Sequence, residues 1–269
     1  MARFTSTVAH VVLAAALLGA TAHAGEMSRE AREAYLRSAK IVSMKDIGEG
    51  ATHPTKVKLD DGNTKMKAIF KSVDLRQKWA SRFGSETTRG YIDSYKNEIA
   101  AYELDKLLGL DMLPVIVERK IKGRRGSLRE WVEHVIPHYG HDEPSPDVDR
   151  MHDQMQAVWL FDSLITNVDR RTHNLMLGPG WAPVLIDHSM GFMDFQKPFR
   201  PMYRFPRETI DRLRALDQRT IRRALRRYLR RHQIRALMRR REILLEHVDR
   251  QLAVRDSSEV FFSLAAVTQ

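Results

Sequence analysis

The sequence predicts an α+β fold of two lobes, in which an antiparallel sheet lobe comes first and a mostly helical lobe follows. Alternating apolar and polar residues in the first half, for instance at residues 55–59, predict strands, and the Asp-Asp-Gly-Asn turn at residues 60–63 predicts a hairpin. From Glu208 onward, apolar residues recur three and four positions apart, which is the spacing of amphipathic helices.

The length and composition of the chain suit one sizeable domain of two lobes or two small domains. The chain has 269 residues, 43% of them hydrophobic, and no cysteine. This apolar content supports a real core and excludes global disorder. The absence of cysteine is compatible with an oxidising compartment for a protein that uses no disulfides.

Residues 1–24 have the pattern of a secretory signal peptide and are not expected to belong to the fold. Arg3 gives a positive start, residues 11–20 form a short apolar run, and Ala22-His-Ala24 supplies small residues for cleavage. No later stretch is long and apolar enough to cross a bilayer. We expect cleavage after Ala24 and export to a periplasm or to the outside of the cell, with no transmembrane segment in the mature chain. An N-terminal anchor helix is the alternative.

Residues 25–40 are expected to form a short amphipathic helix or linker outside the core, ahead of a sheet lobe of residues 41–136. A helix is predicted within this lobe at residues 90–110, where apolar residues recur at helical spacing. Five strands are predicted from short apolar or alternating runs, at residues 39–44, 55–59, 66–71, 113–119 and 126–133.

Two glycines, a lysine and a glutamate of this lobe are candidates for binding phosphate groups. Gly48 and Gly50 lie between the first two predicted strands, and glycine lets backbone N–H groups approach an anion. Lys71 ends the run Ala-Ile-Phe-Lys, which is close to the Val-Ala-Ile-Lys pattern whose lysine binds ATP phosphates in kinases. Glu98 lies in the predicted helix, from which a kinase glutamate pairs with that lysine. Considered alone, the side chains of Lys71 and Glu98 would more often be exposed to solvent.

Residues 137–269 are expected to form the helical lobe. A polar loop begins it, and a helix at residues 151–166 leads into a polar turn. The later elements of this lobe are two short apolar runs at residues 175–177 and 184–187 and helices at residues 210–213, 221–229 and 234–254.

The polar turn after the first helix of this lobe carries the strongest functional pattern. Four residues separate Asp169 from Asn174, and Asp187 ends the second apolar run. In kinases, an Asp in the first position accepts the proton of the substrate hydroxyl, the Asn holds a magnesium ion, and the second Asp holds magnesium against the phosphates. Each residue alone would be explained as an ordinary turn residue. The three residues at these spacings together favour phosphoryl transfer.

These residues lie in segments that resemble known kinase families. Residues 97–115, together with Asn-Val-Asp-Arg at residues 167–170, resemble the secretory-pathway kinases related to the Golgi casein kinase and the xylose kinase. The turn through Asn174 and the run Leu-Ile-Asp-His at residues 185–188 are also similar to the phosphatidylinositol kinases and the HipA-type bacterial kinases. The resemblance covers residues 47–194.

The resemblance implies an atypical protein-kinase-like fold that binds ATP with Mg²⁺ or Mn²⁺ and transfers the γ-phosphoryl group to a hydroxyl of a protein, glycan or small molecule. It implies that Lys71 binds ATP, that Glu98 positions Lys71, and that Asp169 is catalytic. It also implies that Asn174 and Asp187 hold the metal. The sequence departs from typical kinases in two places, because Asp187 begins Asp-His-Ser in place of Asp-Phe-Gly, and Asn-Val in place of His-Arg precedes Asp169.

The positive charge of the chain is concentrated near its C-terminal end. Residues 200–250 contain seventeen arginines, no lysine and six acidic residues, an excess that equals the net charge of +11 of the whole chain. On one helix, the arginines of Arg222–Arg231 would form a basic stripe opposite Leu225 and Leu229. The stripe is explained either as a solvated helix face or as a docking surface for an anionic partner.

Two other functional classes remain as alternatives. A pseudokinase would keep the fold as a binding module without phosphoryl transfer, and the presence of all the predicted catalytic residues argues against it. A basic protein that binds nucleic acid or another anionic surface would explain the arginines. Nucleic acid is the less favoured partner, because the chain has no recognisable motif that reads a groove.

Overall fold

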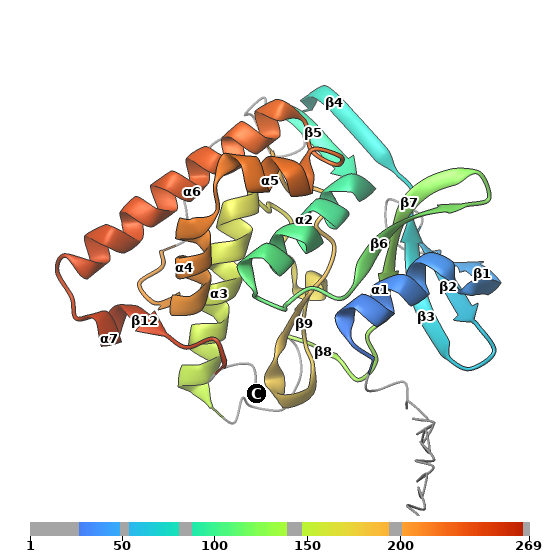
Figure 1. Ribbon diagram of the computed structural model, residues 1–269, viewed down its shortest axis with the longest axis horizontal. Helices are drawn as coiled ribbons and strands as arrows, with labels where there is room; N and C mark the ends of the chain where they lie inside the picture. The colour runs from blue at the N-terminus through green and yellow to red at the C-terminus, as the bar shows by residue number, and fades with distance from the viewer. Residues whose placement is uncertain (1–26, 49–53, 81–87, 139–146, 194–200, 266–269) are drawn as a thin grey trace, which may run out of the picture.

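A computed structural model of the chain describes residues 27–48, 54–80, 88–138, 147–193 and 201–265. The architecture is the predicted α+β fold, with an antiparallel sheet beside a mostly helical lobe (Figure 1). The predicted signal peptide, its cleavage site and Gly50 lie outside the described residues. Within the described ranges, no helix combines the length and the apolar character needed to cross a membrane.

Five antiparallel strands form the sheet, in the spatial order β1-β2-β3-β7-β6. In β2 the predicted alternation holds, since Val57 and Leu59 are buried and Lys58 between them is exposed. Helix α1 (Arg29–Ser38) packs against β6 and β7 and is capped by the Ser28 hydroxyl. The expectation that this helix lies outside the core is wrong, because its apolar face buries Tyr35 and Leu36 in the main core. The strands are β1 (Lys40–Asp46), β2 (Thr55–Asp60), β3 (Lys65–Lys71), β6 (Ile116–Ile121) and β7 (Arg124–Glu130).

The end of β3 is buried continuously from Ala68 to Lys71, because both faces of the sheet are covered there. Strand β3 pairs with β7 so that Lys71 lies opposite Ser127. The neighbouring Gly126 allows this close pairing, since a Cβ atom at that position would lie 2.2 Å from the carbonyl oxygen of Lys71. The register of β3 and β7 therefore places Lys71 and Ser127 side by side.

Helix α2 (Tyr95–Leu108) lies between the sheet and the helical lobe (Figure 1). Ten of its fourteen residues are buried, because the sheet covers one side and helices of the second lobe cover the other. The prediction of a helix from residue 90 is wrong at its start. Thr88–Ser94 is strand β5, which pairs antiparallel with β4 (Asp74–Ala80). The helix begins after Ser94, whose hydroxyl accepts a hydrogen bond from the Lys96 N–H at 3.2 Å.

The helical lobe is built around α3, which packs against α6 and leads into the predicted catalytic turn. Strands β8, β9 and β10 form a small antiparallel sheet, and β11 pairs in parallel with β12. The helices are α3 (Val148–Ile165), α4 (Arg207–Ala215), α5 (Gln218–Leu225), α6 (Arg231–Leu252) and α7 (Ser257–Val260), with the 3₁₀ turns η1 (Thr172–Asn174) and η2 (Pro179–Trp181). The strands are β8 (Ile136–Pro137), β9 (Leu175–Leu177), β10 (Pro183–Leu185), β11 (Phe205–Pro206) and β12 (Phe261–Phe262).

The prediction of one helix through residues 221–229 is also wrong. Helix α5 ends at Leu225, whose carbonyl accepts hydrogen bonds from the N–H groups of Tyr228 at 2.9 Å and Leu229 at 2.8 Å. Arg230 is extended, with φ −76° and ψ 160°, immediately before α6. The arginines between residues 222 and 231 are consequently divided between two helices and a turn, and do not form one continuous stripe.

The buried carboxyl of Asp105 in α2 makes the stability of the fold depend on pH. Burial raises its pKa from 3.8 to about 7, against the opposing effect of a hydrogen bond from the Met112 N–H at 3.2 Å. Between these two pKa values the folded protein holds a proton that the unfolded chain has released. The contribution of this group to stability is therefore largest at low pH and is lost as the pH rises toward 7.

We expect Asp105→Asn to remove this pH dependence, because the amide stays neutral. Relative to wild type, the variant should gain on the order of a few kcal/mol of unfolding free energy between about pH 5 and pH 8. Thermal melts of both proteins across this range test the prediction. An equal response of the two proteins to pH would show that Asp105 does not titrate there.

Candidate active site

Lys71 lies between two carboxylates that come from distant parts of the chain. Its Nζ atom is 2.7 Å from Oε1 of Glu98 in α2 and 2.8 Å from Oδ1 of Asp187, which follows β10. The side chains of Lys71 and Glu98 are almost fully buried, at 10% and 2% exposure, and that of Asp187 is 36% exposed. The structure thus brings three of the sequence-predicted residues into direct contact.

The charges in this cluster stabilise one another. Burial alone would lower the pKa of Lys71, but the carboxylates of Glu98 and Asp187 outweigh that effect and raise the pKa, so the lysine stays protonated. Burial would raise the pKa of Asp187, but Lys71 and a hydrogen bond of 3.1 Å from the Ser189 hydroxyl lower it below its usual value. Asp187 is therefore ionised at neutral pH, which is the form that binds a metal ion.

Ser127 fixes the orientation of Glu98. Its hydroxyl donates to Oε2 of Glu98 at 2.9 Å, so that each carboxylate oxygen of Glu98 has a partner. Ser127 was not among the sequence-predicted residues. The pairing of β3 with β7 is what identifies it, because that register places Ser127 opposite Lys71.

Asn97, next to Glu98, fastens α2 to the segment that follows Asp187. Its fully buried side-chain amide donates to the carbonyl oxygens of Ser189 and Gly191, both at 2.8 Å. Asn97 belongs to the motif that resembles the secretory-pathway kinases, but no separate role is predicted for it from the motif. These two bonds keep α2 and the Asp187 segment at a fixed separation, and so support the contact of Lys71 with both carboxylates.

The predicted catalytic turn is held by its own backbone. The side-chain amide of Asn174 donates to the carbonyl oxygen of Asp169 at 2.9 Å, and the N–H of Ile186 donates to the carbonyl oxygen of Asn174 at 3.2 Å. The Asp169 carboxylate pairs with Nε of Arg171 at 2.5 Å, and its side chain is 18% exposed. Asp169, Asn174 and the residue before Asp187 are therefore linked directly.

Arg170 connects α3, the catalytic turn and the Asp187 segment. Its Nε and Nη2 atoms are 2.9 and 2.8 Å from the carboxylate oxygens of Asp162 in α3, and both side chains are at most 7% exposed. Its Nη1 atom donates to the carbonyl oxygen of Ile186 at 3.1 Å and to that of Asn174. Arg170 belongs to the Asn-Val-Asp-Arg motif, but its linking role depends on contacts with both sides of the turn and is not predicted by the motif.

His188 completes the contacts of Arg170. Its Nε2 atom accepts from Nη2 of Arg170 at 2.8 Å. Complete burial, followed by the positive charge of Arg170, lowers the pKa of His188 well below its usual value, so the imidazole is neutral. The histidine that replaces the phenylalanine of the typical kinase triplet therefore serves as a buried hydrogen-bond acceptor.

The backbone of Asp187 is in the left-handed region, with φ 59°. This conformation is uncommon for a residue with a side chain and persists where the surroundings enforce it. Here the contacts with Lys71 and Ser189 hold the side chain, and the Ile186 N–H anchors the chain just before it. Such strain is concentrated at functional sites.

The oxygen atoms of Asp187 and Asn174 suit a divalent metal that is shared with a nucleotide. Mg²⁺ is usually bound by one or two carboxylates together with substrate phosphates and water, and less often by a cage made of protein alone. Within the part of the chain that the structure describes, no group of three His, Cys, Asp or Glu side chains could hold a metal. The carboxylate of Asp187 and the amide oxygen of Asn174 are ligand types that fit Mg²⁺ or Mn²⁺.

Gly48 lies in the exposed turn after β1, with φ 73°. Its N–H donates to the carboxylate of Asp46 at 2.9 Å. Among the described residues, no contact connects Gly48 with Lys71. The predicted phosphate-covering role of Gly48 and Gly50 therefore stays a prediction, since Gly50 is outside the described residues.

Comparison with known proteins identifies the fold. No protein-family model and no curated protein matches the chain. The structure of hydra Fam20 with sugar matches with a TM-score of 0.64 at 18% identity, over 87% of this chain and 92% of that one. The Golgi casein kinase matches with a TM-score of 0.64 at 13% identity, over 87% and 77% of the two chains.

The Golgi casein kinase with Mn/ADP bound matches with the same TM-score of 0.64, over 87% of this chain and 78% of that chain. The proinflammatory kinase CtkA of Helicobacter pylori matches with a TM-score of 0.52 at 11% identity, over 81% of this chain and 97% of that chain. The resemblance to the secretory-pathway kinases is thus confirmed at the level of the fold, and this chain has the fold of atypical kinases.

Proposed function

We propose that the protein is a kinase that transfers the γ-phosphoryl group of ATP to a hydroxyl. The observation that supports this most is the position of Lys71, held at 2.7 Å from Glu98 and 2.8 Å from Asp187. A lysine paired with a helix glutamate, next to a carboxylate that binds metal, is the arrangement that positions ATP in kinases. The contacts around Asn174 and Arg170 link Asp169 to the same assembly.

In this proposal, the charged Lys71 binds phosphate oxygens of ATP, and Glu98 with Ser127 holds the lysine in place beforehand. The substrate hydroxyl oxygen attacks the γ-phosphorus, the bond between this phosphorus and the ADP oxygen breaks, and the hydroxyl proton moves to the Asp169 carboxylate. Asp187 and Asn174 would hold a divalent metal that neutralises phosphate charge when bound.

The ion pair between Asp169 and Arg171 does not prevent this role. The Arg171 side chain is 65% exposed, and exposed pairs are worth at most about 1 kcal/mol. A substrate hydroxyl can therefore replace the arginine at little cost. The Golgi casein kinase, which has the same fold, was solved with Mn/ADP, and this supports Mn²⁺ beside Mg²⁺ as the metal in our proposal.

Measurement of ADP formation tests the proposed activity. We expect the purified protein, with ATP and Mg²⁺ or Mn²⁺, to form ADP faster when its native extracellular fraction supplies acceptors. Labelled ATP would show whether a protein, a glycan or a small molecule receives the phosphoryl group. A protein that binds ATP but forms no ADP under any of these conditions would be a pseudokinase, and one that does not bind ATP would contradict the proposal altogether.

Asp187→Asn should weaken the metal-dependent binding of ATP by at least about 10–100-fold, since even changes around a metal ligand usually cost that much. The substitution keeps the size of the side chain but removes the charge that the metal requires. Calorimetric titration with ATP at several Mg²⁺ concentrations measures the effect. Ser189→Ala is the matched control, because it removes the 3.1 Å hydrogen bond to Asp187 and leaves the carboxylate. Equal affinity of Asp187→Asn and wild type at every Mg²⁺ concentration would remove Asp187 from the metal site.

We also propose that the kinase is exported, on the basis of the signal-peptide pattern in residues 1–24. N-terminal sequencing of the exported protein should give Gly25 as the first residue. An exported chain that still begins at Met1 would contradict cleavage at this site.

A further inference from the structure

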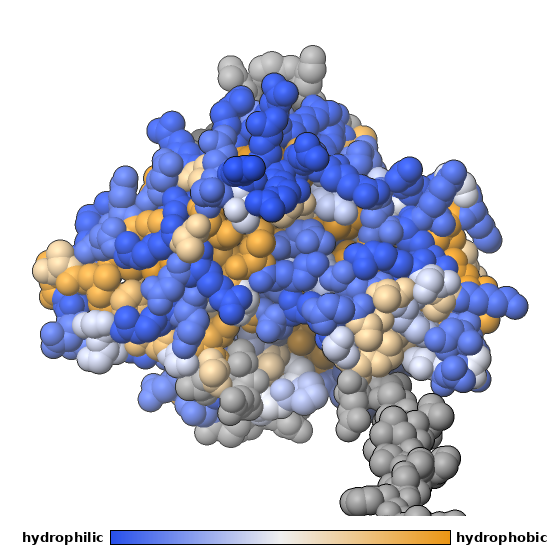
Figure 2. Space-filling view, viewed as in Figure 1, coloured by the Kyte–Doolittle hydropathy of each residue, from blue (hydrophilic) through white to orange (hydrophobic). Residues whose placement is uncertain are grey.

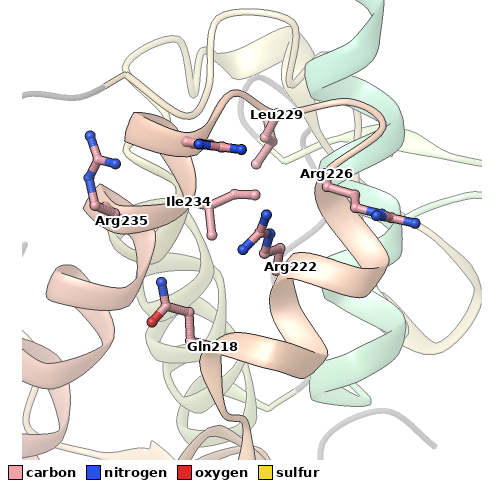
Figure 3. Close-up of a pocket in the computed structure, with 7 residues that line it drawn as sticks. Gln218, Arg222, Arg226, Leu229, Ile234 and Arg235 are labelled. Atoms are coloured by element: carbon pink, nitrogen blue, oxygen red, sulfur yellow. The ribbon is translucent and has the colours of Figure 1, made fainter.

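An arginine-lined hollow of about 350 Å³ lies between α5 and the start of α6. Strongly hydrophilic side chains gather over this part of the surface (Figure 2). In Figure 3, Arg222 projects from α5 toward Leu229 and Ile234, which lie where the chain turns into α6. None of the predicted active-site residues borders this hollow. Its lining consists of Gln218, Arg222, Arg226, Leu229, Arg231, Ile234 and Arg235.

The four arginines of the hollow differ from other arginines of the helical lobe. Arg227 pairs with Glu118 at 2.6 Å, Arg214 pairs with Asp249, and the buried Arg240 donates to main-chain carbonyls. Within the part of the chain that the structure describes, no ion pair or side-chain hydrogen bond involves the guanidinium groups of Arg222, Arg226, Arg231 and Arg235. Their charges are therefore available to a ligand.

The spacing of these arginines indicates what would stabilise them. Arg222 and Arg226 are four residues apart, as are Arg231 and Arg235, and like charges at this separation repel each other. An anion placed between the two pairs would relieve this repulsion. Guanidinium groups donate two parallel hydrogen bonds to the oxygen atoms of phosphate, and arginine, with no lysine, supplies all the positive charge of residues 200–250.

We propose that this hollow binds a compact ligand that carries several phosphate groups. The volume of the hollow favours such a ligand over a nucleic acid, because arginines line a concavity within the usual volume range of small-ligand sites, about 300–1,000 Å³. The end of α5 at Leu225 divides the arginines, so that residues near the end of α5 and at the start of α6 line the same hollow.

Titration of the purified protein with inositol hexakisphosphate tests this site independently of any kinase activity. The triple variant Arg222→Gln/Arg226→Gln/Arg235→Gln should bind at least about tenfold more weakly than wild type, since the loss of one charged hydrogen bond already has that effect. The matched control, Arg37→Gln/Arg124→Gln/Arg250→Gln, removes the same charge from exposed positions elsewhere and should bind almost as well as wild type. Thermal melts establish that both variants are folded.

Two further probes identify the source of the phosphate groups. The first probe is a phosphatidylcholine vesicle that contains phosphatidylinositol 4,5-bisphosphate. Capture of these vesicles by the protein, and their release by inositol hexakisphosphate, would support a lipid headgroup as the source of the phosphate groups. Binding of inositol hexakisphosphate without capture of these vesicles would support a soluble ligand. The proposal would be overturned if inositol hexakisphosphate did not bind, or if both triple variants weakened its binding equally. It would also be overturned if a single-stranded oligonucleotide bound more tightly than inositol hexakisphosphate through the same arginines.

Discussion

Asp169→Asn is expected to lower the rate of phosphoryl transfer by about 10²–10⁴-fold, which is the usual contribution of a positioned acid–base group. The asparagine keeps the size of the side chain but cannot accept the hydroxyl proton. The bond from the Asn174 side chain goes to the main-chain carbonyl of residue 169, so the substitution leaves it intact. ATP binding should therefore stay within about threefold of wild type, and the loss should appear in kcat.

Single-turnover kinetics and calorimetric titration with ATP measure these two quantities separately. Arg171→Gln is the matched control, because it removes the partner of the Asp169 carboxylate at an exposed position and leaves the carboxylate itself. We expect this control to retain most of the activity. Full activity of Asp169→Asn would rule out its role as the base, and a combined loss of transfer and ATP binding would point to a structural role for the carboxylate.

The spacing of the catalytic turn was visible in the sequence because it depends on local geometry. Asp169 and Asn174 lie in one short turn, and Asp187 follows β10, the second strand after that turn, so their separations along the chain report their positions in space. The contact of Lys71 with Glu98 joins residues 27 positions apart and was inferred from motif patterns. Ser127 has no such motif, and only the register of two strands shows that it bonds to Glu98.

The two incorrect helix boundaries have different physical causes. The apolar residues Tyr91 and Ile92 fit the helical periodicity of α2, yet they belong to β5, because pairing with β4 outweighs local preference. Helix α5 ends at Leu225 without a glycine or proline in residues 226–230. The usual signal for a helix end is absent there, so the sequence pattern continues although the helix does not.

Arg170→Met is expected to lower the free energy of unfolding by about 3–5 kcal/mol, the usual cost of removing one partner from a buried ion pair. Methionine preserves much of the apolar volume of the side chain but leaves the carboxylate of Asp162 without its main partner. The side chain of Asp162 is only 6% exposed, so water cannot replace the lost contact. The carbonyl groups of Asn174 and Ile186 and the imidazole of His188 lose a donor in the same step.

Arg171→Met provides a control at the adjacent position, because Arg171 pairs with Asp169 at the surface and its side chain is 65% exposed. We expect this variant to lose less than about 1 kcal/mol. Urea unfolding of both variants gives the two free energies, and we expect a large difference because the contacts of Arg170 are buried and those of Arg171 are exposed. If Arg170→Met unfolded at the same urea concentration as Arg171→Met, the pair with Asp162 would not stabilise the folded protein.

Arg170 also bonds to the backbone on both sides of the catalytic turn. Without these bonds, Asn174 and Asp187 lose their fixed separation. We therefore expect the transfer activity of Arg170→Met to fall even below the temperature at which this variant unfolds.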